Sequence, residues 1–172
     1  MTETPHLDIV PFSEPHFEAI FSNDNIRLGE LLKVETPNNW TTFAEAKEAV
    51  HFLYQTFKSL GDERIWGSYF IILRNERTLI GTGGFKGKPD NDNQVEIGYE
   101  INPLYRNKGF VTQAVQALIE IAFTNNAQSI KAHTLHLESP SSKVLKKCGF
   151  TFKGTINDTD DGPAWCWLLQ KP

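Results

Sequence analysis

The chain has 172 residues, of which 40% are hydrophobic and 22% are charged, and its formal net charge is −4 at pH 7. This length predicts about one domain with a sizeable core, and the acidic balance argues against a nucleic-acid binder or a polybasic membrane binder. The N-terminus lacks the features of a secretory signal, and no stretch approaches the ~18 consecutive apolar residues of a membrane span. We therefore expect a cytoplasmic, single-domain α/β protein.

The first part of the chain predicts one strand followed by helices. Alternating apolar residues predict a strand over 7–12, and apolar residues at helical spacing predict a helix over 14–22. Leucines within 28–32 indicate a short further turn of helix. Thr42-Phe-Ala-Glu45 has the form of a capping box that begins the next helix, which Gly61 ends.

The periodicity then changes to that of strands. β-branched and aromatic residues predict strands over 65–73, 78–85 and 94–102, and the short connections predict an antiparallel meander. The glycines within 81–84 lack the spacing of a dinucleotide-binding fingerprint. They predict a bulge or a close approach of two backbones.

The last part alternates helices and strands. In chain order it predicts a helix over 111–124, a strand over 129–137, a short helix from Ser139 or Ser141 to Lys147, and closing strands over 150–153 and 164–169. A helix separates strands 94–102 and 129–137, so these two are expected to be parallel neighbours. The order β-α-α-β-β-β-α-β-α-β-β predicts a mixed, mostly antiparallel sheet of about seven strands with about four helices.

Cysteines and histidines give no sign of a metal site. Cys148 and Cys166 form no Cys-x-x-Cys pair, and we expect both to be reduced and buried. His133 and His136 lie three positions apart on a predicted strand, so their side chains point to opposite faces. We expect no bound metal.

The segment most informative about function is Pro103-Leu-Tyr-Arg-Asn-Lys-Gly109, which leads from a strand into a helix. Such a turn points several backbone N–H groups at one spot, where the helix dipole adds about half a positive charge. Arg106 and Lys108 add cations, and Gly109 lets the backbone approach a ligand closely. The pattern predicts a site for a pyrophosphate, with an ordinary strand–helix connection as the alternative. A P-loop motif is absent.

Two segments carry a resemblance to a known family: Arg106-Asn-Lys-Gly109-Phe-Val111 and Glu138-Ser-Pro-Ser141-Ser-Lys-Val-Leu-Lys-Lys-Cys-Gly-Phe150. The chain resembles the GCN5-related N-acetyltransferases (GNAT), and most closely their ribosomal-protein alanine acetyltransferase (RimJ/RimL-like) branch. The first segment is similar to the family's acetyl-CoA loop, Gln/Arg-x-x-Gly-x-Gly/Ala, and departs from it at Val111. The second is similar to the branch's Asn-x-Ala-Ser-x-x-Val-Leu-x-Lys-x-Gly-Phe, with Glu138 and Pro140 in place of Asn and Ala.

The resemblance implies the GNAT fold and direct transfer of an acetyl group from acetyl-CoA to a primary amine, either a protein N-terminus or a small amine or amino acid. It implies acceptor-side helices and a meander over about 7–94, an acetyl-CoA-binding core over about 95–154, and closing strands over 150–170. The cofactor-binding residues that it implies are Ile101, Asn102, Arg106, Asn107, Lys108, Gly109, Phe110, Val111, Thr112, Glu138 and Lys143.

The reaction needs a base for the amine and hydrogen-bond donors for an oxyanion, which a backbone N–H at the end of a splayed strand can supply. The resemblance implies that Ser141 contacts the departing thiolate, with helix capping as the alternative role. Cys148 has no evident histidine partner and is not expected to act as a nucleophile. The candidate bases are Asp160, with Asp158 or Asp161 as substitutes, or Glu96 or Glu100, which share one face of a strand.

Some assignments stay open at this stage. Trp40 is a candidate for the acceptor pocket, with core packing as the alternative, whereas Tyr54 and Phe57 are expected to pack. The protein is expected to be a monomer or a homodimer. Alternative functions are a non-catalytic acyl-CoA-binding or regulatory module on the same fold and, less favoured, a phosphate-binding protein that uses nucleotides.

Overall fold

The computed structural model describes residues 4–41, 47–158 and 162–172. The helices and strands follow one another as β1 (Leu7–Pro11), α1 (Glu14–Phe21), α2 (Asn25–Leu32), α3 (Lys47–Leu60), β2 (Ser68–Leu73), β3 (Thr78–Phe85), β4 (Gln94–Ile101), α4 (Phe110–Thr124), β5 (Ser129–Leu135), α5 (Pro140–Lys147), β6 (Thr151–Asp158) and β7 (Gly162–Gln170). No helix of the described residues is long and apolar enough to cross a bilayer.

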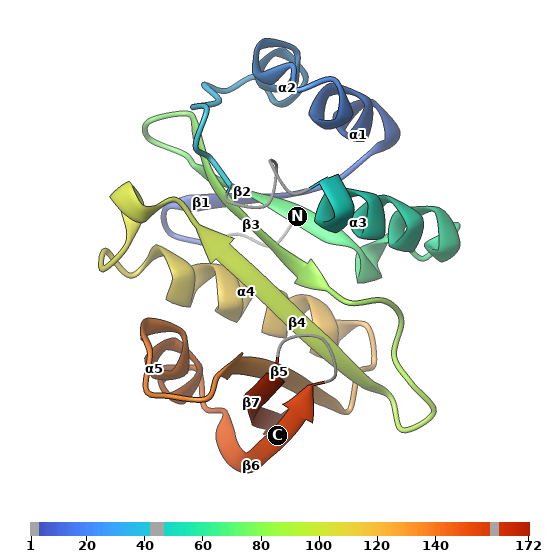
Figure 1. The fold of residues 1–172 in the computed structure, drawn as a ribbon, viewed down its shortest axis with the longest axis vertical. Coiled ribbons are helices and arrows are strands. Elements are labelled where there is room, and N and C mark those ends of the chain that lie inside the picture. The colour runs from blue at the N-terminus through green and yellow to red at the C-terminus, as the bar shows by residue number, and fades with distance from the viewer. Residues whose placement is uncertain (1–3, 42–46, 159–161) are drawn as a thin grey trace.

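The strands form one seven-stranded sheet in the order β1-β2-β3-β4-β5-β7-β6 (Figure 1). β4 and β5 are parallel, and every other pair is antiparallel. The predicted mixed sheet, the meander of β2 to β4 and the parallel β4–α4–β5 unit are therefore confirmed. β7 lies between β5 and β6, so the last strand of the chain is inserted between two earlier strands.

The described residues contain five helices where about four were predicted. The difference lies at Asn25–Leu32, which forms a complete eight-residue helix, α2, instead of a short turn. The Asp24 side chain caps it by accepting a hydrogen bond from the Arg27 N–H at 2.8 Å. The capping box predicted for 42–45 lies outside the described residues.

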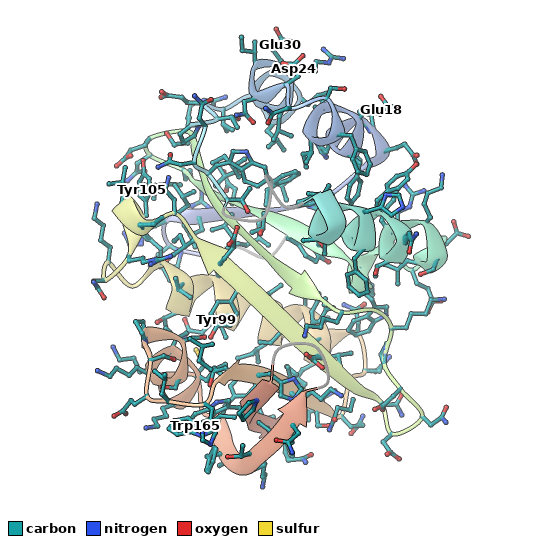
Figure 2. The ribbon with its side chains drawn as sticks, in the orientation of Figure 1. Glu18, Asp24, Glu30, Tyr99, Tyr105 and Trp165 are labelled. Atoms are coloured by element: carbon teal, nitrogen blue, oxygen red, sulfur yellow. The ribbon has the colours of Figure 1, made fainter. Side chains whose placement is uncertain are left out.

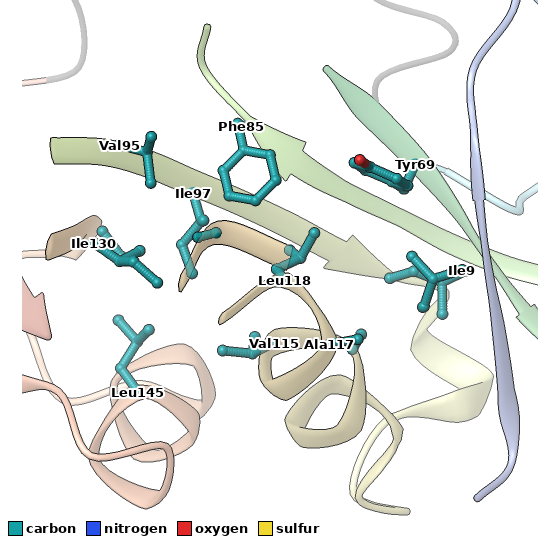
Figure 3. Packing of buried hydrophobic residues seen from close by; sticks show 14 of the residues in the cluster. Ile9, Tyr69, Phe85, Val95, Ile97, Val115, Ala117, Leu118, Ile130 and Leu145 are labelled. Atoms are coloured by element: carbon teal, nitrogen blue, oxygen red, sulfur yellow. The ribbon is translucent and has the colours of Figure 1, made fainter. Parts of the chain in front are cut away.

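Two hydrophobic cores lie on the two faces of the sheet, because side chains alternate along each strand. The first core packs β-strand residues such as Ile97 and Ile130 against Leu118 of α4 and Leu145 of α5 (Figure 3). The second packs other strand residues under α1, α2 and α3, and its buried members include Phe17, Leu28, Phe57, Phe70 and Leu79. Burial of each such side chain contributes about 1.5–3 kcal/mol to folding.

The glycines of β3 mark both features that were predicted for them. A Cβ on Gly81 would lie 2.3 Å from the Glu100 carbonyl oxygen, and one on Gly84 would lie 2.4 Å from the Gly67 carbonyl oxygen. The register between β2 and β3 also shifts beside Gly81, between Ile71 and Ile72. Small residues therefore let β3 pass close to its neighbours where a side chain would collide.

Two strands differ from their predicted boundaries by three residues or more. β2 begins at Ser68 because Arg64–Trp66 forms a single 3₁₀ turn before it. β6 runs on to Asp158, beyond the predicted 150–153, because it pairs with β7 along its length. Both differences reflect pairing across the sheet, which local patterns do not specify.

Candidate active site

The parallel pairing of β4 with β5 ends halfway along both strands. It joins Gln94–Ile97 to Ser129–Ala132. Beyond it, β4 pairs with β3 and β5 pairs with β7. Among the described residues, the facing edges of 98–101 and 133–135 therefore have no ladder partner, and we call this opening the splay.

Two residues of β4 direct their main-chain N–H groups into the splay. The Asn102 N–H donates to the Ile80 carbonyl at 2.8 Å, so the main chain at even-numbered positions faces β3. Because the direction alternates along a strand, the N–H groups of Tyr99 and Ile101 face the opposite way, toward β5. Donors in that position suit an oxyanion that forms within the splay.

The turn after β4 leaves the first amides of α4 open. Pro103–Tyr105 forms a 3₁₀ turn, and Gly109 adopts a φ of +81° directly before α4. α2 and α5 begin with side-chain caps, but α4 has none. Within the described chain, no group accepts a hydrogen bond from the N–H groups of 110–112. These amides lie at the positive end of a 15-residue helix, which is a suitable site for a phosphate group.

The side chains around this turn divide into exposed polar groups and buried supports. Arg106, Asn107 and Lys108 are exposed. Asn102 is buried, and its Oδ1 accepts from the Leu104 N–H at 3.0 Å, which fixes the start of the turn. The predicted cationic rim is therefore present, and Asn102 supports the turn with its side chain.

The residues that follow show why Val111 is tolerated in the turn. The side chains of Phe110 and Val111 pack against the first core, together with the buried Ile101. The methyl groups of Val111 therefore lie in the core behind the turn, while its backbone amide remains among the open N–H groups. The Thr112 carbonyl accepts a weak hydrogen bond from the Cys148 thiol at 3.9 Å.

α5 places Ser141 beside β4. Ser139 is the N-cap, because its side chain accepts from the Ser142 N–H and the Ser142 hydroxyl accepts from the Ser139 N–H. Ser141 is therefore not needed as the cap, and its Oγ instead lies 2.9 Å from the Tyr99 Oη. Figure 2 labels Tyr99 on β4. Burial raises the pKa of Tyr99 to about 12, so its hydroxyl remains protonated near neutral pH.

Tyr99 is a candidate site residue that the sequence did not single out, because it belongs to neither of the two segments that carry the resemblance. Glu138, in contrast, lies at the surface. The Lys146 ammonium donates to its carboxylate at 3.0 Å and lowers the pKa of Glu138. Lys143 is also exposed, on the same helix as Lys146.

Glu96 and Glu100 share the sheet face opposite Ile97 and Ile101, as predicted. Their surroundings differ. Glu96 contacts Lys86 at 2.5 Å, His133 at 3.0 Å and Lys131 at 3.6 Å. Burial alone would raise the pKa of Glu96, but Lys86 and His133 together lower it. Glu100 accepts a hydrogen bond from the Thr41 hydroxyl.

The loop candidates for the base cannot be placed. Asp160 and Asp161 lie outside the described residues, as does the side chain of Asp158. Their predicted role therefore stays a prediction.

A groove of about 630 Å³ lies on the same face as Glu100. Ala49, Phe52 and Leu53 of α3 form one wall. Its other lining residues come from β2, β3 and β4 and from Lys86 directly after β3, and the strand residues are Ser68, Thr82, Gly83, Gly84, Phe85, Gly98, Tyr99 and Glu100. A hollow of similar volume, about 640 Å³, lies beside α2 and the β2–β3 turn, and no residue of the splay lines it.

Trp40 is outside the lining of this groove. It is 1% exposed, and its ring lies 5.9 Å from that of Phe70 in the second core. Its Nε1–H donates to the Asn25 side chain at 3.3 Å. Core packing accounts for this environment, and the role of Trp40 in acceptor binding stays a prediction. Phe57 is buried and Tyr54 packs beside it, as predicted.

The two thiols are free and half-buried. Burial raises the pKa of Cys148 to about 11, so the thiolate that a nucleophile requires is scarce near neutral pH. His133 and His136 contact different partners: His133 contacts Glu96, and His136 lies with its ring edge toward Trp165 at 6.2 Å.

Comparisons with known proteins agree with this geometry. Residues 6–151 match the family described as acetyltransferase (GNAT) domain. The chain is 28% identical over 151 residues to the uncharacterized N-acetyltransferase YjdG of Bacillus subtilis, and the match covers 87% of this chain and 89% of YjdG.

Solved structures show the same fold at low sequence identity. The ribosomal-protein-S5-alanine acetyltransferase of Vibrio fischeri matches with a TM-score of 0.69 and 18% identity, over 99% of this chain and 98% of that one. RimL, a ribosomal L7/L12 alpha-N-protein acetyltransferase solved with coenzyme A, matches with a TM-score of 0.68 and 16% identity, over 97% and 95% of the two chains.

Proposed function

We propose that this chain, which belongs to the GNAT acetyltransferases, transfers the acetyl group of acetyl-CoA to a primary amine, either a protein N-terminus or a small amine or amino acid. In this proposal the elements up to about residue 94 form the acceptor side, and 95–154 bind acetyl-CoA. The observation that carries it is the combination of the splay with the open amides of α4 at its end.

The open amides support a site for the pyrophosphate of acetyl-CoA. The N–H groups of 110–112 supply donors, and Arg106 and Lys108 supply positive charge at the rim. The packing of Val111 into the core supports this role, because it leaves the mouth of the turn clear. When bound, acetyl-CoA supplies a thioester whose carbonyl carbon accepts the amine and whose sulfur leaves.

The walls of the splay contain suitable groups for that thioester. The N–H groups of Tyr99 and Ile101 face the splay and can stabilise negative charge on an oxygen there. When Tyr99 donates its hydrogen bond to the Ser141 Oγ, the Ser141 hydroxyl hydrogen is available to the departing sulfur. Ser141 is therefore our candidate for the thiolate contact, with Tyr99 as its positioning partner.

The groove between α3 and the sheet is our candidate for the acceptor site. At Gly84 and Gly98 the floor of the groove carries no side chain, and a Cβ on Gly98 would meet no atom within 4 Å. The Glu100 carboxylate at this floor favours an acceptor that arrives as an ammonium ion. Glu100, Glu96 and Asp160 remain the candidate bases taken from sequence.

A non-catalytic acyl-CoA-binding module is the second candidate function. Glu138 favours it, because a carboxylate paired with Lys146 stands where the branch has an amide that contacts pantetheine. The departure at Val111 does not favour it, since that side chain packs into the core.

Thiol release separates the two functions. We expect the protein, incubated with acetyl-CoA and a panel of primary amines and N-terminal peptides, to release coenzyme A with at least one acceptor and to yield its acetylated product by mass spectrometry. Tight binding of acetyl-CoA without release for any acceptor would favour the non-catalytic module. Stabilisation by ATP but not by coenzyme A would indicate a nucleotide-binding protein instead.

A further inference from the structure

His133 is the first residue of β5 beyond its pairing with β4. The last pair of the ladder is Ile97 with Ala132, so His133 stands level with Gly98 across the start of the splay. Ser68, Gly84 and Gly98 are partners in one row across β2, β3 and β4. His133 is therefore the residue of β5 that comes next to this row of the groove floor, at the point where β5 separates from β4.

The His133 side chain lies on the groove face of the sheet. Ile130 and Ala132 are buried in the first core, on the face that α4 and α5 cover. Alternation then directs His133 to the opposite face, which is the face of Glu96 and Glu100. Gly98 carries no side chain, and a Cβ there would meet no atom within 4 Å, so the groove floor next along the sheet from His133 is open at this position.

Glu96 orients the imidazole of His133. The Glu96 Oε1 lies 3.0 Å from the His133 Nδ1, and both side chains are largely buried, with 14% and 18% of their surfaces exposed. An ionised carboxylate can only accept a hydrogen bond, so Nδ1 carries the proton and the neutral ring has its lone pair on Nε2. In the described part of the chain, Nε2 has no hydrogen-bond partner.

We propose that His133, held by Glu96, is the general base that takes a proton from the acceptor amine in the groove, directly or through one water molecule. This inference rests on the proposed acetyltransferase function and deepens it. A carboxylate that fixes one nitrogen of a histidine leaves the other ready to accept a proton, which is the usual arrangement of such a pair in catalysis. Glu96 is then a positioning residue.

The proposal accounts for the contacts of Glu96 better than a direct catalytic role does. Glu96 is occupied by Lys86, Lys131 and His133, and its low pKa makes it a weak base. Among the described residues, the ionisable groups on the face of His133 are Glu96, with the two lysines bound to it, Glu100 beyond Gly98, and Cys166, its register partner on β7.

The acceptor enters as an ammonium ion, and one proton passes from its nitrogen to the His133 Nε2. The amine lone pair then forms a bond to the acetyl carbonyl carbon, and the carbon–sulfur bond breaks with its electron pair on sulfur. The second amine proton ends on that sulfur, and His133 returns its own proton to solvent. The products are the amide, coenzyme A and one released proton.

The experiment combines a structural and a kinetic readout. Nitrogen-15 NMR of the free protein near neutral pH is expected to show His133 protonated at Nδ1 and unprotonated at Nε2, and Glu96→Gln is expected to remove this preference. With the best acceptor of the amine panel, His133→Gln is expected to lower kcat about 100-fold or more and to abolish the acidic limb of the pH profile. The affinity for acetyl-CoA is expected to stay within about twofold.

His136→Gln is the matched control, because His136 lies three residues away and contacts only the Trp165 ring among the described residues. It is expected to keep both the wild-type rate and the wild-type pH profile. A wild-type enzyme whose His133 carries its proton on Nε2, or whose His133→Gln variant keeps its rate and acidic limb, would overturn the proposal alone. A wild-type protein that releases no thiol with any amine would overturn the proposed function and this inference with it.

Discussion

The Tyr99 Oη lies 2.9 Å from the Ser141 Oγ, so one hydrogen bond joins β4 to the first turn of α5. Tyr99 lies on β4, at one edge of the splay, and Ser141 lies on the helix that follows β5. Because Tyr99 is largely buried and its hydroxyl stays protonated, the bond persists across the physiological pH range. Ser141, which was predicted from the sequence, is thus positioned by Tyr99, which was not predicted.

Loss of the Tyr99 hydroxyl is expected to weaken catalysis through Ser141. Tyr99→Phe removes one hydrogen bond, worth about 1 kcal/mol, and should lower kcat about 3- to 10-fold. Ser141→Ala should lower kcat at least about tenfold. The double variant should be no slower than Ser141→Ala, because both changes remove the same interaction. Steady-state thiol release measures all three.

Equal and additive losses in the two single variants would show that Tyr99 and Ser141 act separately. Acetyl-CoA affinity, measured by calorimetry, serves as the control, since neither hydroxyl is assigned to the pyrophosphate.

The turn at Gly109 is expected to control the affinity for acetyl-CoA. Gly109 has a φ of +81°, so Gly109→Ala strains the backbone by about 1–2 kcal/mol and moves the open amides of α4. We expect the Kd for coenzyme A to rise at least about fivefold. Gly61→Ala is the control, because Gly61 also has a positive φ, +55°, but lies at the end of α3.

Both glycine variants should lower the melting temperature, but Gly61→Ala should leave the Kd for coenzyme A unchanged. A similar change of Kd in both variants would mean that the turn at Gly109 has no special role in binding.

A side chain at Gly98 is expected to obstruct the acceptor while sparing the fold. A Cβ at this position would meet no atom within 4 Å, so Gly98→Ala fits the folded protein, and Gly98→Val extends the side chain from the same open position. Because Gly98 lines the groove, kcat/KM for the acceptor should fall in the order wild type, Ala, Val, by about tenfold or more for Val. Wild-type kcat/KM in the Val variant would exclude the groove as the acceptor site.

Alkaline pH is expected to destabilise the protein through Cys148. Burial raises the pKa of this thiol from 9.0 to about 11, so the folded protein keeps a proton that the unfolded chain gives up. The stabilisation is complete below pH 9 and is lost as the pH rises through about 11. Allowing for solvent screening of a half-buried group, we expect an effect of about 1 kcal/mol.

Thermal unfolding at pH 8 and at pH 10.5 tests this expectation. The melting temperature of Cys148→Ala should fall less between the two values than that of the wild type. An equal fall would assign the alkaline sensitivity to other groups, such as Tyr99.

The parts of the site that depend on local pattern could be predicted from the sequence. The turn of 103–109 and the glycines of β3 have residue types whose backbone behaviour is intrinsic, and alternation placed Glu96 and Glu100 on one face. The partners of these residues could not be predicted in this way. The Tyr99–Ser141 bond depends on where α5 packs, and the Glu96–His133 contact depends on the register of β4 with β5.

Dependence on tertiary contacts also explains why α2 was predicted only as a short turn of helix. α2 has only eight residues and contains Gly29 in its interior, and the helix is completed by the Asp24 cap and by burial of Leu28 in the second core. Tertiary packing therefore decided a segment whose intrinsic helical tendency is weak.

The short ladder between β4 and β5 also has a mechanical meaning. Only four residues of each strand join β1–β4 to β5, β7 and β6, so the sheet consists of two halves held by a narrow seam and by α4. Such a seam is a natural place for slow opening motions, and the amide hydrogens of Tyr99 and Ile101, which face the splay, should exchange early. A ligand bound across this seam would hold the two halves of the sheet together. Binding at the site would then make the whole sheet more rigid.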